Sequence, residues 1–280
     1  MSWRITIEHS STYRYAGHVT SSYNEARITP LSFARQLVID SSVTISPPTP
    51  PFRYWDYWGT LVHAFDVDEA HDHLEVTATS LVETSAPPRP APACTWDDLA
   101  SSDVTDQFAE LLTPTWYVPV DDEVTQIARQ LAGGRSPEGA CTAALEWVCD
   151  NLRYEKGSTT VSTDALEALR QRRGVCQDFA HVLLAILRGM GIPARYTSGY
   201  LHPSSGAEVG ETVVGQSHAW VEAWLGDWLA LDPTNAQPVG DRHVVVGRAR
   251  DYGDVSPLKG IYHGGPAESL DVVVRITRVG

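Results

Sequence analysis

The segment Gly174-Val-Cys-Gln-Asp-Phe-Ala-His181 contains the residue on which both the fold and the chemistry depend. From Cys176 onward, apolar residues recur three or four positions apart, which predicts a helix that begins at or just after the cysteine. A thiol in the first turn lies near the positive end of the helix dipole and near N–H groups without a helical partner. Both favour the thiolate and the binding of an oxyanion, so Cys176 is a candidate nucleophile. A buried structural cysteine is the alternative.

A nucleophilic cysteine needs a base, and the base needs a group that orients it. His218 lies in a stretch that we expect to be a strand, residues 216–224, and a second such stretch begins at Trp228 and is followed by residues up to Asn235. The short connection at Gly226 and Asp227 predicts a β-hairpin. His218 is therefore the candidate base, although a single histidine in a strand is more often structural.

The length of the hairpin loop decides which group lies beside His218. With a two-residue loop the numbers of paired residues sum to 453, so His218 faces Asn235 and Asp232 points to the other face. With an odd loop centred on Gly226 the sum is 452, so Asp232 faces Trp220 and is a diagonal neighbour of His218. Three-residue loops containing glycine are common. We therefore prefer Asp232 as the orienting group and keep Asn235 as the alternative.

The rest of the chain divides at a proline-rich stretch. Trp3, Ile5 and Ile7 alternate with polar residues, and similar strands follow, which predicts an antiparallel β domain over residues 1–85. The prolines that begin at residue 87 predict an extended linker over residues 86–104. Residues 105–280 read as helices first and antiparallel strands afterwards, so we expect an α+β domain in which the helices pack on the sheet.

Composition excludes several functional classes. The 280 residues include 21 Lys and Arg and 35 Asp and Glu, a formal net charge of −14, which argues against nucleic acid or an anionic membrane as the main partner. No stretch of eighteen apolar residues is present. The four cysteines, Cys94, Cys141, Cys149 and Cys176, lack CxxC spacing, so neither a disulfide scaffold nor a zinc ribbon is expected. A reducing cytoplasm is the natural inference.

Metal binding is a weaker alternative. Cys176 could pair with His181, and His71 could pair with His73 on one face of a strand, but no further ligand spacing supports either pair. No calcium-loop spacing is present either. We therefore expect no metal and no cofactor.

Several blocks together resemble the transglutaminase-like cysteine enzymes, in the bacterial branch that carries its own N-terminal β domain. The resemblance rests on residues 174–181, 191–200, 217–222, 231–235 and 250–257, with residues 55–59 and 73–76 in the first domain. It covers nearly the whole chain. It implies a papain-like core in which Cys176, His218 and Asp232 form a catalytic triad. It also implies an oxyanion site made by the backbone N–H of Cys176 and an upstream side chain, for which Tyr154 is our candidate.

The resemblance implies attack on an amide carbonyl and a thioester intermediate, with a peptide or protein as the substrate. We favour hydrolysis of the thioester, because water needs no dedicated acceptor site. The alternatives are transfer to an amine, as in a protein-glutamine acyltransferase, and a non-catalytic binding or scaffold protein of the same fold. Trp220 is a candidate for the substrate groove, and core packing is the alternative reading of its side chain.

Overall fold

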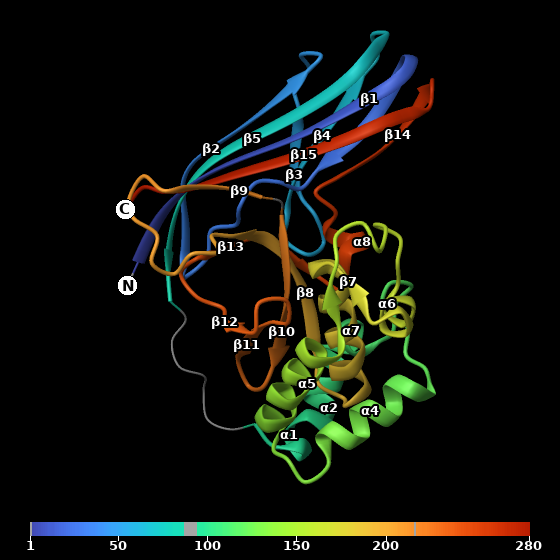
Figure 1. Cartoon of the computed structure of the whole chain (residues 1–280), viewed down its shortest axis with the longest axis vertical. Coiled ribbons are helices and arrows are strands. Elements are labelled where there is room, and N and C mark those ends of the chain that lie inside the picture. Colours follow the sequence, from blue (N-terminus) through green and yellow to red (C-terminus); the bar gives the residue numbers. More distant parts are fainter. Residues whose placement is uncertain (1, 87–93, 216) are drawn as a thin grey trace.

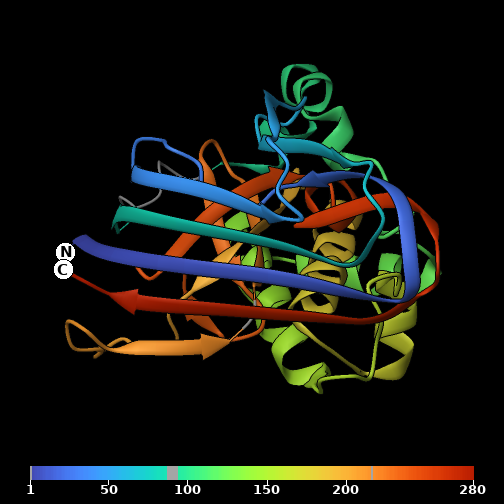
Figure 2. The ribbon, with the colours of Figure 1, turned by 90° about the horizontal axis from the view of Figure 1, so that it is seen from above.

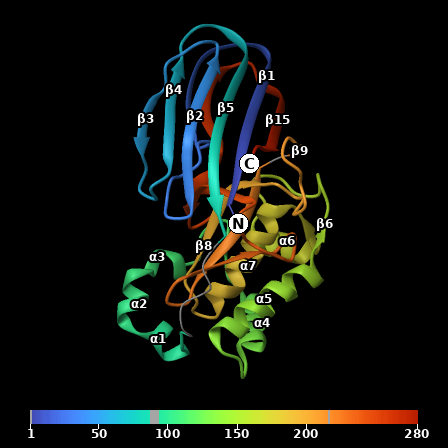
Figure 3. The ribbon, with the colours of Figure 1, turned by 90° about the vertical axis from the view of Figure 1, so that its left-hand side faces the viewer.

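The computed structural model describes residues 2–86, 94–215 and 217–280. An antiparallel sheet forms one end of the molecule, and helices with a second sheet form the other (Figures 1 and 3). The first sheet has the order β2-β5-β1-β15-β9, with β4 and β14 also paired to β1 and with β3 paired to β4. Its strands are β1 (Ser2–Ala26), β2 (Gln36–Ser46), β3 (Phe52–Trp55), β4 (Leu61–Val67), β5 (His71–Ser85), β9 (Thr212–Gly215), β14 (Leu258–Gly264) and β15 (Ala267–Arg278).

The second sheet has the order β12-β11-β10-β8-β13. Its strands are β8 (Ala194–Leu201), β10 (His218–Trp224), β11 (Trp228–Asp232), β12 (Gln237–Pro238) and β13 (His243–Ala249), and a short parallel pair is formed by β6 (Arg153–Tyr154) and β7 (Arg173–Gly174). The helices are α1 (Trp96–Ala100), α2 (Ser102–Gln107), α3 (Ala109–Leu112), α4 (Asp122–Ala132), α5 (Pro137–Asn151), α6 (Ala165–Gln171), α7 (Cys176–Gly189) and α8 (Tyr252–Val255). In the described ranges, no helix is both long and apolar enough to cross a membrane.

Helix α7 is the centre of the second half. Every residue from Gln177 to Arg188 is buried, because β10 covers one side of the helix and α4, α5 and α6 cover the others. A helix that is covered on all sides is expected to be mostly apolar, and α7 is apolar except at a few buried polar positions such as Asp178, His181 and Arg188. The α+β class expected from the sequence is confirmed, and so is a helical layer that packs on an antiparallel sheet.

The expected domain boundaries differ from the structure at two places. The last strands, β14 and β15, pair with β1, and β9 extends the same sheet, so the chain returns to the first sheet after it has built the core. Figure 2 shows β1 in blue and β15 in red side by side, with the two termini together. Residues 105–280 are therefore not one self-contained unit. Residues 87–93 of the predicted linker lie outside the described residues, and its end is helical because Thr95 caps α1.

An apolar cluster joins the first sheet to the second. Trp3, Ile5 and Ile7 alternate with outward residues along β1, as the sequence predicts, and their buried side chains contact Tyr200 and Val244 of the core. Burying large apolar groups contributes about 1.5–3 kcal/mol for each side chain. The cluster therefore holds the two sheets together.

Gly199 of β8 lies directly opposite His218 in the second sheet. A Cβ atom at this position would lie 2.0 Å from the carbonyl oxygen of Val244 and 2.7 Å from the ring of Trp220. The absent side chain leaves the space that Trp220 fills beneath His218.

We expect Gly199→Ala to lower the free energy of unfolding by about 1–3 kcal/mol, because the backbone and the ring must both move. Urea denaturation measures the change. Gly206→Ala is the matched control, since a Cβ there meets open space, and its effect should stay within about 0.5 kcal/mol. Equal stabilities of the two variants would contradict the packing described for Gly199.

Candidate active site

Cys176 is the first residue of α7, as the sequence predicts. Val175 before it is extended, and the carboxylate of Asp178 accepts the N–H of Val175 at 2.7 Å and the hydroxyl of Thr159 at 2.7 Å. A Cβ at Gly174 would lie 2.5 Å from that carboxylate, so only glycine leaves room for it. These contacts fix the turn that places the sulfur of Cys176 at the start of the helix.

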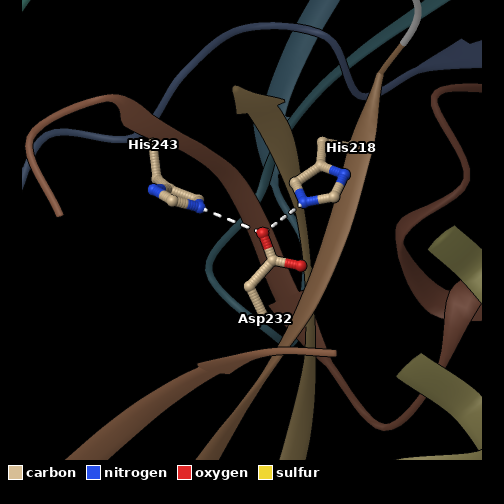
Figure 4. A group of neighbouring side chains, drawn as sticks. All are labelled: His218, Asp232 and His243. Atoms are coloured by element: carbon tan, nitrogen blue, oxygen red, sulfur yellow. Dashed lines mark hydrogen bonds and ion pairs between the residues drawn. The ribbon is translucent and has the colours of Figure 1, made fainter. Parts of the chain in front are cut away.

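His218 and Asp232 meet in the register that an odd loop requires. Val221 pairs with Leu231, so paired numbers sum to 452, and the N–H of Leu225 donates to the carbonyl of Asp227 across the loop. The Nε2 atom of His218 donates to the Oδ2 atom of Asp232 at 2.8 Å (Figure 4). Of the two registers left open by the sequence, the structure has the one that brings Asp232 to His218.

Asp232 is completely buried and accepts hydrogen bonds on both oxygens. Oδ2 also accepts from the side-chain amide of Asn235 at 2.9 Å and from Nε2 of His243 at 3.3 Å. Oδ1 accepts the N–H groups of Thr234 at 3.0 Å and Asn235 at 3.3 Å. Burial alone would raise the pKa of Asp232, but these bonds and the charge of His218 hold it well below its usual range. Asn235, the alternative orienter, thus supports Asp232.

His243 is a functional candidate that the sequence reasoning missed. Its Nδ1 atom accepts the backbone N–H of Gly240 at 3.2 Å, so its proton is on Nε2, and this N–H donates to Asp232 (Figure 4). Burial lowers the pKa of His243 despite the nearby carboxylate, so the ring is neutral at pH 7. The only sequence signal is a histidine at the start of the apolar run 244–246, which does not indicate a partner in another strand.

The charge state of His218 follows from its two partners. Burial favours the neutral ring, but the hydrogen bonds and charges of Asp232 and Cys176 outweigh it and raise the pKa of His218 to about 10. Nε2 is occupied by Asp232. Nδ1 is therefore the ring nitrogen available for the hydrogen bond with Cys176.

Two cavities meet at Cys176 and His218. One, of about 330 Å³, extends between the second sheet and the first, and the other, of about 290 Å³, opens beside Asn235 and Lys156. Cys176, His218 and Tyr154 line both. Tyr154 is thus brought to Cys176, and burial together with the negative charges of Cys176 and Asp178 raises the pKa of its hydroxyl.

Trp220, the candidate for the substrate groove, does not line the two cavities at Cys176. Its side chain has no exposed surface and lines neither of them. The ring lies 5.9 Å from that of His218 and 5.3 Å from that of His243, measured between centroids, and borders a separate cavity near Arg248. Trp220 occupies the core because Gly199 opposite offers it space.

The other thiols are ordinary. Burial raises the pKa of Cys141 to about 12, and burial followed by nearby carboxylates raises the pKa of Cys94 and of Cys149. All four cysteines are free. None of the other three lines the cavities at His218.

The weaker metal pairs have other roles. His181 is buried and accepts the N–H of Tyr252 at 3.2 Å, and the Nδ1 atom of His71 contacts the carbonyl of Glu69 at 2.7 Å. The donor atoms of His218, Asp232 and His243 lie within 4.8 Å of one another and are the kind that zinc binds. Their hydrogen bonds to each other already account for this arrangement.

Comparison with known proteins agrees with this architecture. The model of the transglutaminase-like superfamily matches residues 125–233, and that of the bacterial transglutaminase-like N-terminal region matches residues 5–83. An uncharacterised protein of Mycobacterium leprae is 49% identical over 99% of both chains, and one of Mycobacterium tuberculosis is 35% identical over 98% of this chain and 92% of its own.

More distant relatives carry functional names. A protein-glutamine gamma-glutamyltransferase of Pseudomonas aeruginosa is 39% identical over 67 residues, which are 22% of this chain and 10% of that protein. The crystal structure of a candidate cysteine protease from Cytophaga hutchinsonii has the same fold, with a TM-score of 0.80 and 22% identity over 100% of this chain and 92% of its own. The chain therefore belongs to the transglutaminase-like superfamily and carries the bacterial transglutaminase-like N-terminal region.

Proposed function

We propose that the protein is a cysteine-dependent hydrolase of amide or peptide bonds that acts through a thioester. The observation that carries the proposal is the convergence of Cys176, at the start of a buried helix, with a hydrogen-bonded His218–Asp232 pair on one cavity. A purely structural role would not need a buried carboxylate that contacts an imidazole, which in turn contacts a thiol.

In the first step the sulfur of Cys176 attacks the carbonyl carbon of the amide. The C–N bond then breaks, and the protonated ring of His218 gives its proton to the leaving nitrogen, which departs as an amine or ammonia. Asp232 holds the ring in position and stabilises its positive charge, as its hydrogen bond to Nε2 requires.

The oxyanion formed during attack needs donors. Backbone N–H groups in the first turn of a helix have no helical acceptor, so the N–H of Cys176 is available. Tyr154 is the proposed second donor, because it lines the same cavities and its raised pKa keeps the hydroxyl protonated.

In the second step a water molecule attacks the thioester. His218 takes the proton of the water, the C–S bond breaks, and Cys176 leaves as thiolate. Transfer to an amine uses the same acyl-enzyme, and the relative named as a glutamyltransferase keeps it as the second candidate. We place the protein in a reducing cytoplasm with a peptide or protein as substrate, in accord with its free thiols.

The first prediction concerns turnover. Incubation with a peptide library that contains glutamine amides should give acids whose mass reports the exchange of ammonia for water, and Cys176→Ala should lower the rate by about 10³-fold or more. A parallel reaction with a primary amine separates the two candidates, because transfer joins the acyl group to the added amine in place of the leaving ammonia or amine, whereas hydrolysis joins it to water.

Limiting iodoacetamide gives an independent readout of Cys176. Peptide mapping should find Cys176 labelled faster than Cys94, whose pKa is raised by burial. Equal labelling, together with unchanged turnover in Cys176→Ala, would remove the basis of the enzyme proposal.

The second prediction concerns the protonation of His218. Its raised pKa means that the ring stays charged at pH 7 and loses its proton only near pH 10. In Asp232→Asn the pKa should fall, because a neutral amide removes the charge that favours the imidazolium. NMR titration of the ring, assigned by comparison with His218→Gln, measures both values. An unchanged pKa of His218 in Asp232→Asn would refute the role of Asp232 as the group that orients the ring. Asp66→Asn is the control, because Asp66 is an exposed residue of β4 in the first sheet.

The third prediction tests His243 as a positioning residue. His243→Phe removes the N–H donated to Asp232, so kcat should fall about tenfold, the effect of one hydrogen bond to a charged group. His243→Gln keeps an N–H donor and should recover most of that loss. The pH profile of kcat/KM should shift in the Phe variant alone. Equal activity in both variants, with matching melting temperatures, would show that the bond has no role.

A further inference from the structure

The larger cavity at Cys176 has a wall from the first sheet. His9, Ser11 and Tyr13 of β1 and Val272 of β15 line it, opposite Tyr154 and Tyr196 of the core. We call this space the intersheet cavity. Its volume of about 330 Å³ is near the lower end of the range for small-molecule sites, so it accommodates one compact group.

Apart from the reacting pair Cys176 and His218, the walls of the intersheet cavity are uncharged near neutral pH. The described residues that line it include no Asp, Glu, Lys or Arg. Burial lowers the pKa of His9 to about 4 and raises the pKa of Tyr196 and of Tyr252, so these groups are all neutral. A charged substituent would lose its hydration there, and among the described lining residues the charged group it would meet is the ring of His218, which already interacts with Asp232 and Cys176.

A hydrogen-bond relay sets the polar character of this wall. The hydroxyl of Tyr200 donates to the carbonyl of Ile28 at 3.1 Å, so the hydroxyl oxygen must accept from Nδ1 of His9 at 2.8 Å. The Nε2 atom of His9 then accepts the hydroxyl proton of Ser11 at 3.1 Å. The oxygen of Ser11 is left as an acceptor, which suits a single N–H or O–H donor.

The smaller cavity differs in character. It is bordered by Lys156, Thr234 and Asn235 as well as by apolar residues such as Val213 and Ile276, and Lys156 is exposed. Charged parts of a substrate can therefore remain hydrated on that side. The two sides of Cys176 thus differ in charge, because the described residues that line the intersheet cavity include no counterpart of Lys156.

We propose that the intersheet cavity binds an uncharged, aromatic-sized group attached to the reacting amide, so that the N-terminal sheet determines substrate specificity. Aromatic groups fit a wall of tyrosines, and a phenol or indole N–H can donate to Ser11. This inference rests on the proposed function, because it names the substrate class of the same site.

Alkylation of Cys176 tests the cavity without any need for turnover. N-benzyl-2-chloroacetamide places a neutral ring on the amine side of the carbonyl, and N-(carboxymethyl)-2-chloroacetamide places a charge there. The ketones 1-chloro-3-phenylpropan-2-one and 5-chloro-4-oxopentanoate make the same comparison on the acyl side. Rates at Cys176 are measured by peptide mass mapping and divided by the rate of each reagent with free glutathione.

In at least one series the neutral aromatic reagent should react about tenfold faster than the charged one, and that series identifies the side on which the group binds. Equal normalised rates in both series would overturn the proposal. If the preference is present but no amide is hydrolysed, the cavity assignment stands and the hydrolase proposal fails. If amides are hydrolysed but the reagents show no preference, the hydrolase proposal stands and the cavity assignment fails.

Val272→Lys adds a cation to the cavity wall and should raise the rate of the carboxylate reagents relative to the aromatic ones. Val273→Lys is the matched control, because Val273 is the next residue of β15 and lines neither cavity. An equal change in both variants would overturn the role of this wall. Thermal melting checks that both fold, and the comparison of reagents on the natural chain holds even where a variant does not.

Discussion

The buried carboxylate of Asp232 is the interaction on which the site depends. An unpaired charge without exposed surface would cost several kcal/mol, so the surrounding chain must supply donors. They come from the loop after β11, through Thr234 and Asn235, and from two other strands, through His218 and His243. One anion thus fixes the relative positions of β10, β11 and β13. Because His218 takes its orientation from the same oxygen, the placement of the base is a consequence of satisfying that charge.

The odd number of residues in the hairpin loop places Asp232 beside His218. The three residues between Trp224 and Trp228 set the pairing sum at 452, which puts Asp232 on the face of His218. A loop one residue shorter would turn the carboxylate to the face covered by α7, where Val221 and Ala223 are packed. In the observed register, the ring of Trp220 lies on the same face as His218 and needs room between the strands. Gly199 provides it, so the register and the glycine depend on each other.

Local patterns predicted the parts of the site that depend on local structure. The start of α7 at Cys176 follows from apolar periodicity, and the meeting of His218 with Asp232 follows from counting across one short loop. His243 was missed because its partner is reached across two strands, a relation that no spacing reveals. The burial of Trp220 was uncertain for a similar reason, since it depends on a glycine in the neighbouring strand. The pairing of β14 and β15 with β1 was not predicted, because alternation identifies a strand but does not identify its sheet.

The return of the chain to the first sheet connects the proposed specificity cavity with the proposed catalytic residues. Ser11 of β1 pairs with Val272 of β15, so the wall of the intersheet cavity is made by the two ends of the chain. That wall is bound to the core through His9, whose ring donates to Tyr200. Tyr200 follows Gly199, the residue that pairs with His218. The same strand, β8, therefore positions both His218, the proposed base, and the surface opposite it. Separating the sheets would break the apolar contacts of Tyr200 as well, so the cavity has its shape only while the two halves are docked.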